Sequence, residues 1–71
     1  MNKKRLIILL RQVRLDADLT QLELGEKLSQ TQSYVSKYES GEQRLDLMEI
    51  EAICSAVGIT LLEFIERYLE S

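Results

Sequence analysis

The fold is decided by the stretch LTQLELGEKLSQTQSYVSKYESGE, Leu19 to Glu42, in which two short helical segments follow each other closely. The first is expected over Thr20 to Leu28 and the second over Thr31 to Ser40. A connection of only two or three residues is too short for a relaxed antiparallel hairpin, so the helices should cross steeply, as in a helix-turn-helix. Gly25 lies midway along the first segment, where glycine lowers helix propensity. We interpret it as a point of close approach by the second helix; a glycine that the helix merely tolerates is the alternative.

A sequence pattern typical of helix N-termini occurs three times. It consists of an apolar residue, Thr or Asp, a Glu three residues later and a further apolar residue, which together are typical of a capping box with a hydrophobic staple. The capping pairs are Thr20 and Glu23, Asp46 and Glu49, and Thr60 and Glu63. Helices are therefore expected to begin near residues 20, 46 and 60.

Two further helices complete the predicted fold. One runs from about Asn2 to Ala17; the other is the segment from Thr31, with Thr31 as its N-cap. Gly41 and Gly58 supply the positive φ angle that often follows a helix end. Since no strand pattern is found, the fold class is all-α: a compact five-helix bundle that contains a helix-turn-helix, in one domain over residues 1–71. The helix-turn-helix spans about 20–40, and helices at about 46–57 and 60–69 complete the core and a dimer surface.

Composition excludes several classes of protein. Cys54 is the single cysteine and histidine is absent, so neither an intrachain disulfide nor a Cys/His zinc site is expected. The apolar run near the start ends at Arg11, too early for a signal peptide, and no stretch is long enough for a membrane span. We expect a cytoplasmic protein without a cofactor, metal or small-molecule ligand. No nucleophile and base, metal cluster or phosphate loop indicates an enzyme.

Charge is divided unevenly along the chain. The total is -3, but residues 1–44 hold eight basic and six acidic residues, whereas residues 45–71 hold one basic and six acidic residues. The first part therefore carries +2 and the second -5, which indicates that the two parts face different partners.

The second helix of the pair has an unusual polar side. At about 100° per residue, one arc of roughly 140° collects small hydroxyls, an amide and a lysine. These residues are Gln32, Ser33, Ser36, Lys37 and Ser40. A solvated helix face normally carries Glu, Lys and Arg, which are stronger helix formers than serine. The composition therefore favours a role in recognition; a merely solvated face is the alternative.

The sequence resembles the Xre/Cro-type helix-turn-helix family of phage repressors and bacterial regulators. The resemblance runs through LTQLELGEKL, TQSYVSKYESGE and LDLMEIEAICSAVGITLLEFI, within residues 19–65. It implies that the helix from Thr31 to Ser40 lies in the major groove of double-stranded DNA. Three positions depart from the family pattern: Asp18 and Ser29 replace glycines that are usual after the first and second helices, and Gln30 stands where an aliphatic residue is frequent.

The resemblance assigns the DNA-binding residues. Gln32, Ser33 and Lys37 match base-contact positions, and their side chains suit adenine and guanine edges. Ser36 is added from the helical geometry alone. Gln21 matches a position that contacts phosphate or braces the recognition helix, and Arg44 a loop position that contacts phosphate. The predicted DNA-binding set is Gln21, Thr31, Gln32, Ser33, Ser36, Lys37 and Arg44. For the basic side chains at positions 3–5, phosphate contact and solvation both remain open.

Two other pairs are predicted to be structural. Arg14 and Glu39 match an ion pair that joins two helices in the family. Tyr34 and Tyr38 resemble base-stacking residues, but stacking needs unpaired bases. We expect both tyrosines in the core.

The last helix is expected to form a homodimer. Its apolar arc covers about 160°, wider than the roughly 100° that one core needs. We expect Leu61, Phe64 and part of Leu62 to serve the core, and a second set to bury against a copy of the chain: Ile65, Tyr68 and Leu69. A flank formed by Met48, Ala52 and Ala56 is the alternative surface.

The sequence therefore predicts a dimeric, sequence-specific transcriptional regulator of a bacterium or phage. It is expected to repress by occupying a palindromic operator. The alternative is a protein-interaction module, such as an antitoxin-like subunit with the same fold.

Overall fold

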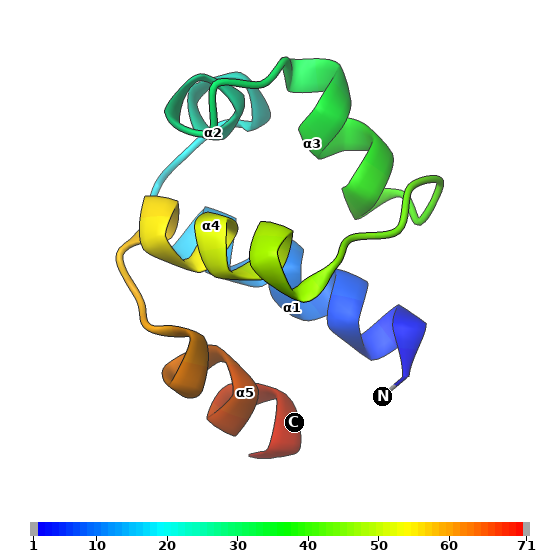
Figure 1. The fold of residues 1–71 in the computed structure, drawn as a ribbon, viewed down its shortest axis with the longest axis vertical. Helices are drawn as coiled ribbons and strands as arrows, with labels where there is room; N and C mark the ends of the chain where they lie inside the picture. Colours follow the sequence, from blue (N-terminus) through cyan, green and yellow to red (C-terminus); the bar gives the residue numbers. More distant parts are fainter. Residues whose placement is uncertain (1, 71) are drawn as a thin grey trace.

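The computed structural model describes residues 2–70, and within them all regular structure is helical. The five helices lie close to the predicted positions (Figure 1). Their bounds are α1 Lys3–Asp16, α2 Gln21–Lys27, α3 Gln32–Glu39, α4 Leu47–Val57 and α5 Leu61–Glu70. The predicted all-α, five-helix fold is confirmed.

A central pair of helices separates the two ends of the molecule. In Figure 1, α2 and α3 lie at one end of the molecule and α5 at the other, with α1 and α4 between them. Side chains from all five helices meet in one core, which includes Leu10, Leu24, Val35, Ile53 and Phe64. No helix among residues 2–70 is long and apolar enough to cross a membrane. This arrangement leaves one side of α3 directed away from the rest of the protein.

The predicted capping boxes are present. Thr20 Oγ1 accepts a hydrogen bond from the Glu23 backbone N–H at 3.1 Å, and Glu23 Oε1 accepts one from the Thr20 N–H at 2.9 Å. The Asp46 and Glu49 pair and the Thr60 and Glu63 pair form the same reciprocal bonds. Each box satisfies two backbone donors that the first turn of a helix leaves free.

Asp18 and Ser29, two of the departures from the family pattern, end α1 and α2. Asp18 and Ser29 take φ angles of 57° and 56°, in the left-handed region that glycine occupies more easily. After each, the next N–H reaches back to a carbonyl five residues earlier, from Leu19 to Arg14 and from Gln30 to Gly25. These are Schellman ends, and Thr31 caps α3 as predicted.

One expectation about α4 differs from the structure. Ala56, assigned to an outer flank, is half-buried and packs against the core. Leu47, in the first turn of α4, is exposed. Cys54 is buried, and burial raises the pKa of its thiol.

Gly25 lies where α2 and α3 cross. A Cβ atom at this position would lie 2.8 Å from the Thr31 carbonyl oxygen and 2.9 Å from its carbon. Both are backbone atoms at the N-cap of α3, so no side-chain rotation can relieve the contact. The interpretation of Gly25 as a point of close approach is confirmed.

Gly25→Ala is expected to destabilise the protein by up to about 2 kcal/mol. Overpacking costs about 1 to 3 kcal/mol, which exceeds the roughly 1 kcal/mol that alanine gains in helix propensity. Urea denaturation measures the change. Ser29→Gly in the same turn is the control, because relief of its left-handed strain should have the opposite sign. A Gly25→Ala protein more stable than the wild type would contradict the close approach.

Candidate nucleic-acid interface

The outer face of α3 holds most of the predicted base-reading residues. Gln32, Ser33 and Lys37 are exposed, as is the N-cap Thr31, whose Oγ1 accepts the Tyr34 N–H at 3.1 Å. Ser36 lies on the same polar arc but is half-buried, beside Arg11 and Gln21. The structure thus leaves four of the predicted residues exposed on α3 and its N-cap, and Ser36 partly covered.

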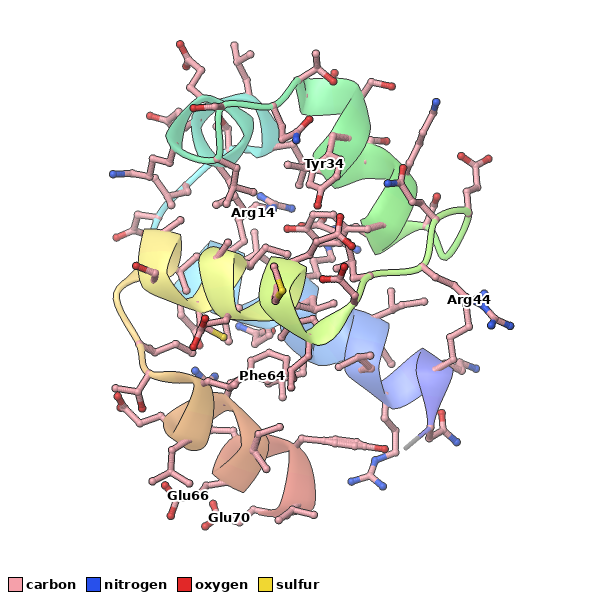
Figure 2. All side chains as sticks on the ribbon, viewed as in Figure 1. Arg14, Tyr34, Arg44, Phe64, Glu66 and Glu70 are labelled. Carbon is pink, nitrogen blue, oxygen red and sulfur yellow. The ribbon has the colours of Figure 1, made fainter. Side chains whose placement is uncertain are left out.

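A buried ion pair fixes α3 against α1. Arg14 Nε and Nη2 donate to the two carboxylate oxygens of Glu39 at 2.8 and 3.0 Å, and Nη1 donates to the Leu19 carbonyl at 2.8 Å. Both charged side chains are almost fully buried, and Figure 2 shows Arg14 inside the molecule. The hydrogen bond to Glu39 raises the pKa of Arg14 above its usual value. The predicted Arg14 and Glu39 contact is present and has bidentate geometry.

The ion pair is linked to the surface by two amides. Gln21 Nε2 donates to Glu39 Oε1 at 3.2 Å, and Gln21 Oε1 accepts from Gln32 Nε2 at 2.8 Å. Gln21 therefore braces α3, one of the two roles the resemblance offered for it. The bond also restricts Gln32 and directs its remaining hydrogen-bonding groups. Sequence reasoning missed this link because it depends on the crossing angle of α2 and α3.

The tyrosines of α3 face inward, as expected. Tyr38 is buried, and its ring meets that of Tyr34 edge-to-face with 5.6 Å between centroids. Tyr34 Oη donates to Glu49 Oε2 at 3.0 Å, while Glu49 Oε1 belongs to the capping box of α4. Burial, with the neighbouring carboxylate, raises the pKa of Tyr34 to about 12. These contacts fasten the inner side of α3 to α4.

Some basic side chains extend into solvent, whereas others pack within the protein. Arg44 is exposed in the loop after α3, and Figure 2 shows it extending away from the core. Arg5, by contrast, lies over the Tyr68 ring at 4.5 Å and donates to the Tyr68 carbonyl at 2.7 Å. Arg5 therefore serves the packing of α1 on α5. Arg11 was not selected from the sequence, yet it lies beside Gln21 and Ser36.

One of the three predicted dimer residues lies in the core and not on the surface. Tyr68 is 5% exposed, because Arg5 covers its ring and its hydroxyl accepts the Asn2 N–H at 2.5 Å. Its assignment to the dimer surface is therefore corrected: Tyr68 belongs to the core of the chain itself. Ile65 is half-buried, and Leu69 is 76% exposed. Leu62, given partly to the core, is also exposed.

Comparison with known proteins gives the family. A helix-turn-helix family model matches residues 10–64. The chain belongs to the Xre-type helix-turn-helix family. An XRE-family like protein from Pseudomonas syringae pv. tomato str. DC3000 shares 34% identity, with a TM-score of 0.88 over 96% of this chain and 83% of that one. No match was found among curated proteins.

Two more distant structures share the fold. The clp gene regulator ClgR from C. glutamicum has 24% identity and a TM-score of 0.84, over 100% of this chain and 91% of that one. The restriction-modification controller protein C.Esp1396I, solved as a tetramer with its natural 35 base-pair operator, has 20% identity and a TM-score of 0.87. That match covers 96% of this chain and 90% of the controller protein. Family and fold together make this chain a DNA-binding transcription regulator of the helix-turn-helix class.

Proposed function

We propose that the protein is a sequence-specific repressor that binds a palindromic operator as a homodimer. The observation that carries the proposal is the exposed face of α3, which a hydrogen-bonded series from Arg14 through Glu39 and Gln21 to Gln32 holds in place. A recognition surface fixed before binding loses less side-chain entropy on binding.

The side chains on this face suit base edges in the major groove. Lys37 can donate to guanine O6 and N7, and Ser33 can donate or accept. Gln32 has one amide hydrogen engaged with Gln21 and keeps its carbonyl and second hydrogen available. Arg44 and Thr31 lie at opposite ends of α3, where the phosphates that flank the groove would pass.

The exposed leucines of α5 support the proposed homodimer, and the homodimer in turn supports the proposed repression. Leu62 and Leu69 protrude from α5, at the end of the molecule opposite α2 and α3 (Figure 1). A two-fold dimer through α5 would present two copies of α3, which must lie one DNA turn, about 34 to 36 Å, apart to read a palindrome. The operator complex of C.Esp1396I is an assembly of several subunits, which supports a multimeric state here. A small regulator with these surfaces would act in the cytoplasm by excluding other proteins from a promoter.

Selection of bound sites from random duplex DNA tests the function. The proposal predicts an inverted repeat whose half-sites are separated by a helical turn. Binding should weaken as salt rises, with a slope of about -0.9 in log-log terms per phosphate neutralised. Failure to enrich any duplex would instead favour the protein-interaction module, in which the fold is kept while the acidic α5 surface binds a protein.

Lys37→Ala is expected to weaken operator binding by about 1 to 3 kcal/mol and to relax preference at one base position. The reason is that Lys37 is exposed on α3 and has no acidic partner among residues 2–70. Fluorescence anisotropy with single-base operator variants measures both effects. Lys27→Ala, which removes an exposed lysine from the end of α2, should change neither preference nor folding. Equal loss by Lys37→Ala on every duplex would show that Lys37 contacts phosphate only.

A further inference from the structure

A hollow of about 270 Å³ lies between the start of α1 and the loop that joins α3 to α4. Its volume is just below the roughly 300 to 1,000 Å³ of typical small-molecule pockets. It equals the volume of about nine water molecules, at about 30 Å³ each, so it can hold a compound with on the order of ten non-hydrogen atoms. The hollow is separate from the exposed face of α3, because Gln32, Ser33 and Lys37 do not line it.

The floor and walls of the hollow are largely apolar. Leu10 and Tyr38 are 2% and 1% exposed and form the floor. The loop lies close to α1 here, because a Cβ atom at Gly41 would lie 3.1 Å from Ile7 Cδ1. Such a lining favours the apolar part of a small ligand. The walls are half-buried aliphatic side chains: Leu6, Ile7 and Leu45.

The mouth of the hollow is basic. Lys3 from the first turn of α1 and Arg44 from the loop are the exposed members of its lining. No carboxylate lies within ion-pair distance of either cation among residues 2–70, and no acidic residue lines the hollow. Gln43 is half-buried beside Arg44, and its side-chain amide makes no hydrogen bond within the same residues. Two cations and an amide without internal partners favour an anionic group that accepts hydrogen bonds.

The floor carries one further polar group. Tyr38 Oη is buried and has no hydrogen-bond partner among residues 2–70. Buried hydroxyls are seldom left unpaired, so a polar atom at the inner end of a ligand would be favourable. Burial raises the pKa of Tyr38 above its usual value, which keeps the hydroxyl protonated and able to donate.

We propose that this hollow binds a small carboxylate with an apolar body, whose carboxylate group lies between Lys3 and Arg44. The apolar body would pack against the floor and walls. A free phosphate would meet the same two cations but would leave the apolar walls without a partner, so it fits less well. The sequence predicted no small-molecule ligand, because the hollow depends on how the loop after α3 folds against α1 and no sequence pattern marks it.

The bound carboxylate would regulate operator binding. This step rests on the proposed function, in which Arg44 contacts a phosphate of the duplex. The carboxylate and the phosphate compete for the same guanidinium, so each weakens the binding of the other by the same factor. The ligand would therefore act as an inducer that releases the protein from its operator.

Amide NMR spectra of the free protein test the binding site. The probes are phenylacetate and 4-hydroxyphenylacetate, which adds a polar atom at the end opposite the carboxylate. Either probe should shift the amide signals of Ile7 and Gln43 saturably, with a Kd of about 1 mM or tighter. Acetate has the charge without the apolar body, and phenylacetamide has the body without the charge. Both should bind at least about tenfold more weakly than phenylacetate.

A matched pair of charge reversals locates the carboxylate. Lys3→Glu should weaken phenylacetate binding about tenfold or more, because it places a like charge at the mouth of the hollow. Lys4→Glu makes the same change at the next exposed position, which does not line the hollow, and should keep the affinity within about threefold of the wild type. Thermal unfolding should stay close to that of the wild type in both variants, since both side chains are exposed.

Fluorescence anisotropy with the selected operator tests the regulatory step. Saturating phenylacetate should lower operator affinity about tenfold and reduce the slope of log K against log salt by about 0.9 for each Arg44 that it occupies. Acetate at the same concentration is the control for ionic strength. Arg44→Gln should bind the operator more weakly and should no longer respond to phenylacetate.

The inference would be overturned by the absence of saturable shifts with both probes, by equally tight binding of phenylacetamide, or by equal effects of Lys3→Glu and Lys4→Glu. Ligand binding that leaves operator affinity unchanged would overturn the regulatory step. None of these results affects the proposed function. A protein that binds no duplex in a salt-dependent way would overturn the proposed function instead, and the titrations of the free protein would still decide whether the hollow binds a carboxylate.

Discussion

Glu39→Ala is expected to lower the free energy of unfolding by about 3 to 5 kcal/mol, because it leaves the buried Arg14 charge without its partner. A domain of this size is stabilised by roughly 4 to 11 kcal/mol in total, at 0.05 to 0.15 kcal/mol per residue. The loss is therefore a large share of the whole stability. DNA binding should fall with it, since Gln21 also loses its acceptor and no longer orients Gln32. Urea denaturation and operator binding on the same samples measure the two effects.

Two variants separate the ion pair from other causes. Glu42→Ala removes an exposed carboxylate from the following loop and should leave stability within about 0.5 kcal/mol of the wild type. The double variant Arg14→Met with Glu39→Leu replaces the pair by apolar side chains and should recover most of the lost stability. It should not recover DNA binding, because the acceptor for Gln21 is still absent. A Glu39→Ala protein with unchanged stability would show that the burial of Arg14 carries no such penalty.

The helix boundaries followed from the sequence because their signals are local. Thr20, Asp46 and Thr60 each need only a Glu three residues later to form a capping box, and all three boxes are present. Asp18 and Ser29 show the limit of such reasoning. Their side chains do not require a left-handed angle, yet both take it because each follows a helix that ends in a Schellman turn.

The site was predictable where it resembles a known pattern and less so where it depends on packing. The Arg14 and Glu39 contact came from the resemblance. The link from Gln21 to Gln32 and the position of Arg11 beside Gln21 depend on how α1, α2 and α3 cross, which no sequence spacing specifies. For α5, the width of the apolar arc can be read from the sequence, but the part of the arc that packs into the core cannot. Tyr68 belongs to the core because Arg5 of α1 packs over its ring.

The dimer surface that we propose lies at the outer edge of α5. Figure 2 shows Phe64 directed into the core and Glu66 and Glu70 directed outward. Along one edge of the helix, between these two sides, lie the exposed Leu62 and Leu69 with the half-buried Ile65, spaced three and four residues apart so that they share one face. Exposed leucines in a row on a small protein are typical of an interaction surface. We therefore expect this edge to bury against a second copy.

Leu69→Glu is expected to split the dimer while leaving the monomer folded. Leu69 is 76% exposed, so a carboxylate there costs the isolated chain little. In a two-fold dimer each copy would have to desolvate a carboxylate, and a loss of about 2 kcal/mol per copy weakens association roughly 1,000-fold. Operator affinity should fall by about 100- to 10,000-fold, because a single half-site loses the effective concentration that links two recognition helices.

Sedimentation and operator binding, measured beside thermal unfolding, decide the outcome. Ile8→Glu is the matched control for assembly, since it places the same charge on an exposed apolar position of α1 that is 60% exposed and should leave the dimer intact. Ile65→Glu should also yield monomers, but with some loss of stability because Ile65 is half-buried against the core. If Leu69→Glu remains dimeric, the interface does not use this edge of α5. Met48 and Ala52, the exposed part of the α4 flank, would then be the next surface to test, because they border the start of α5.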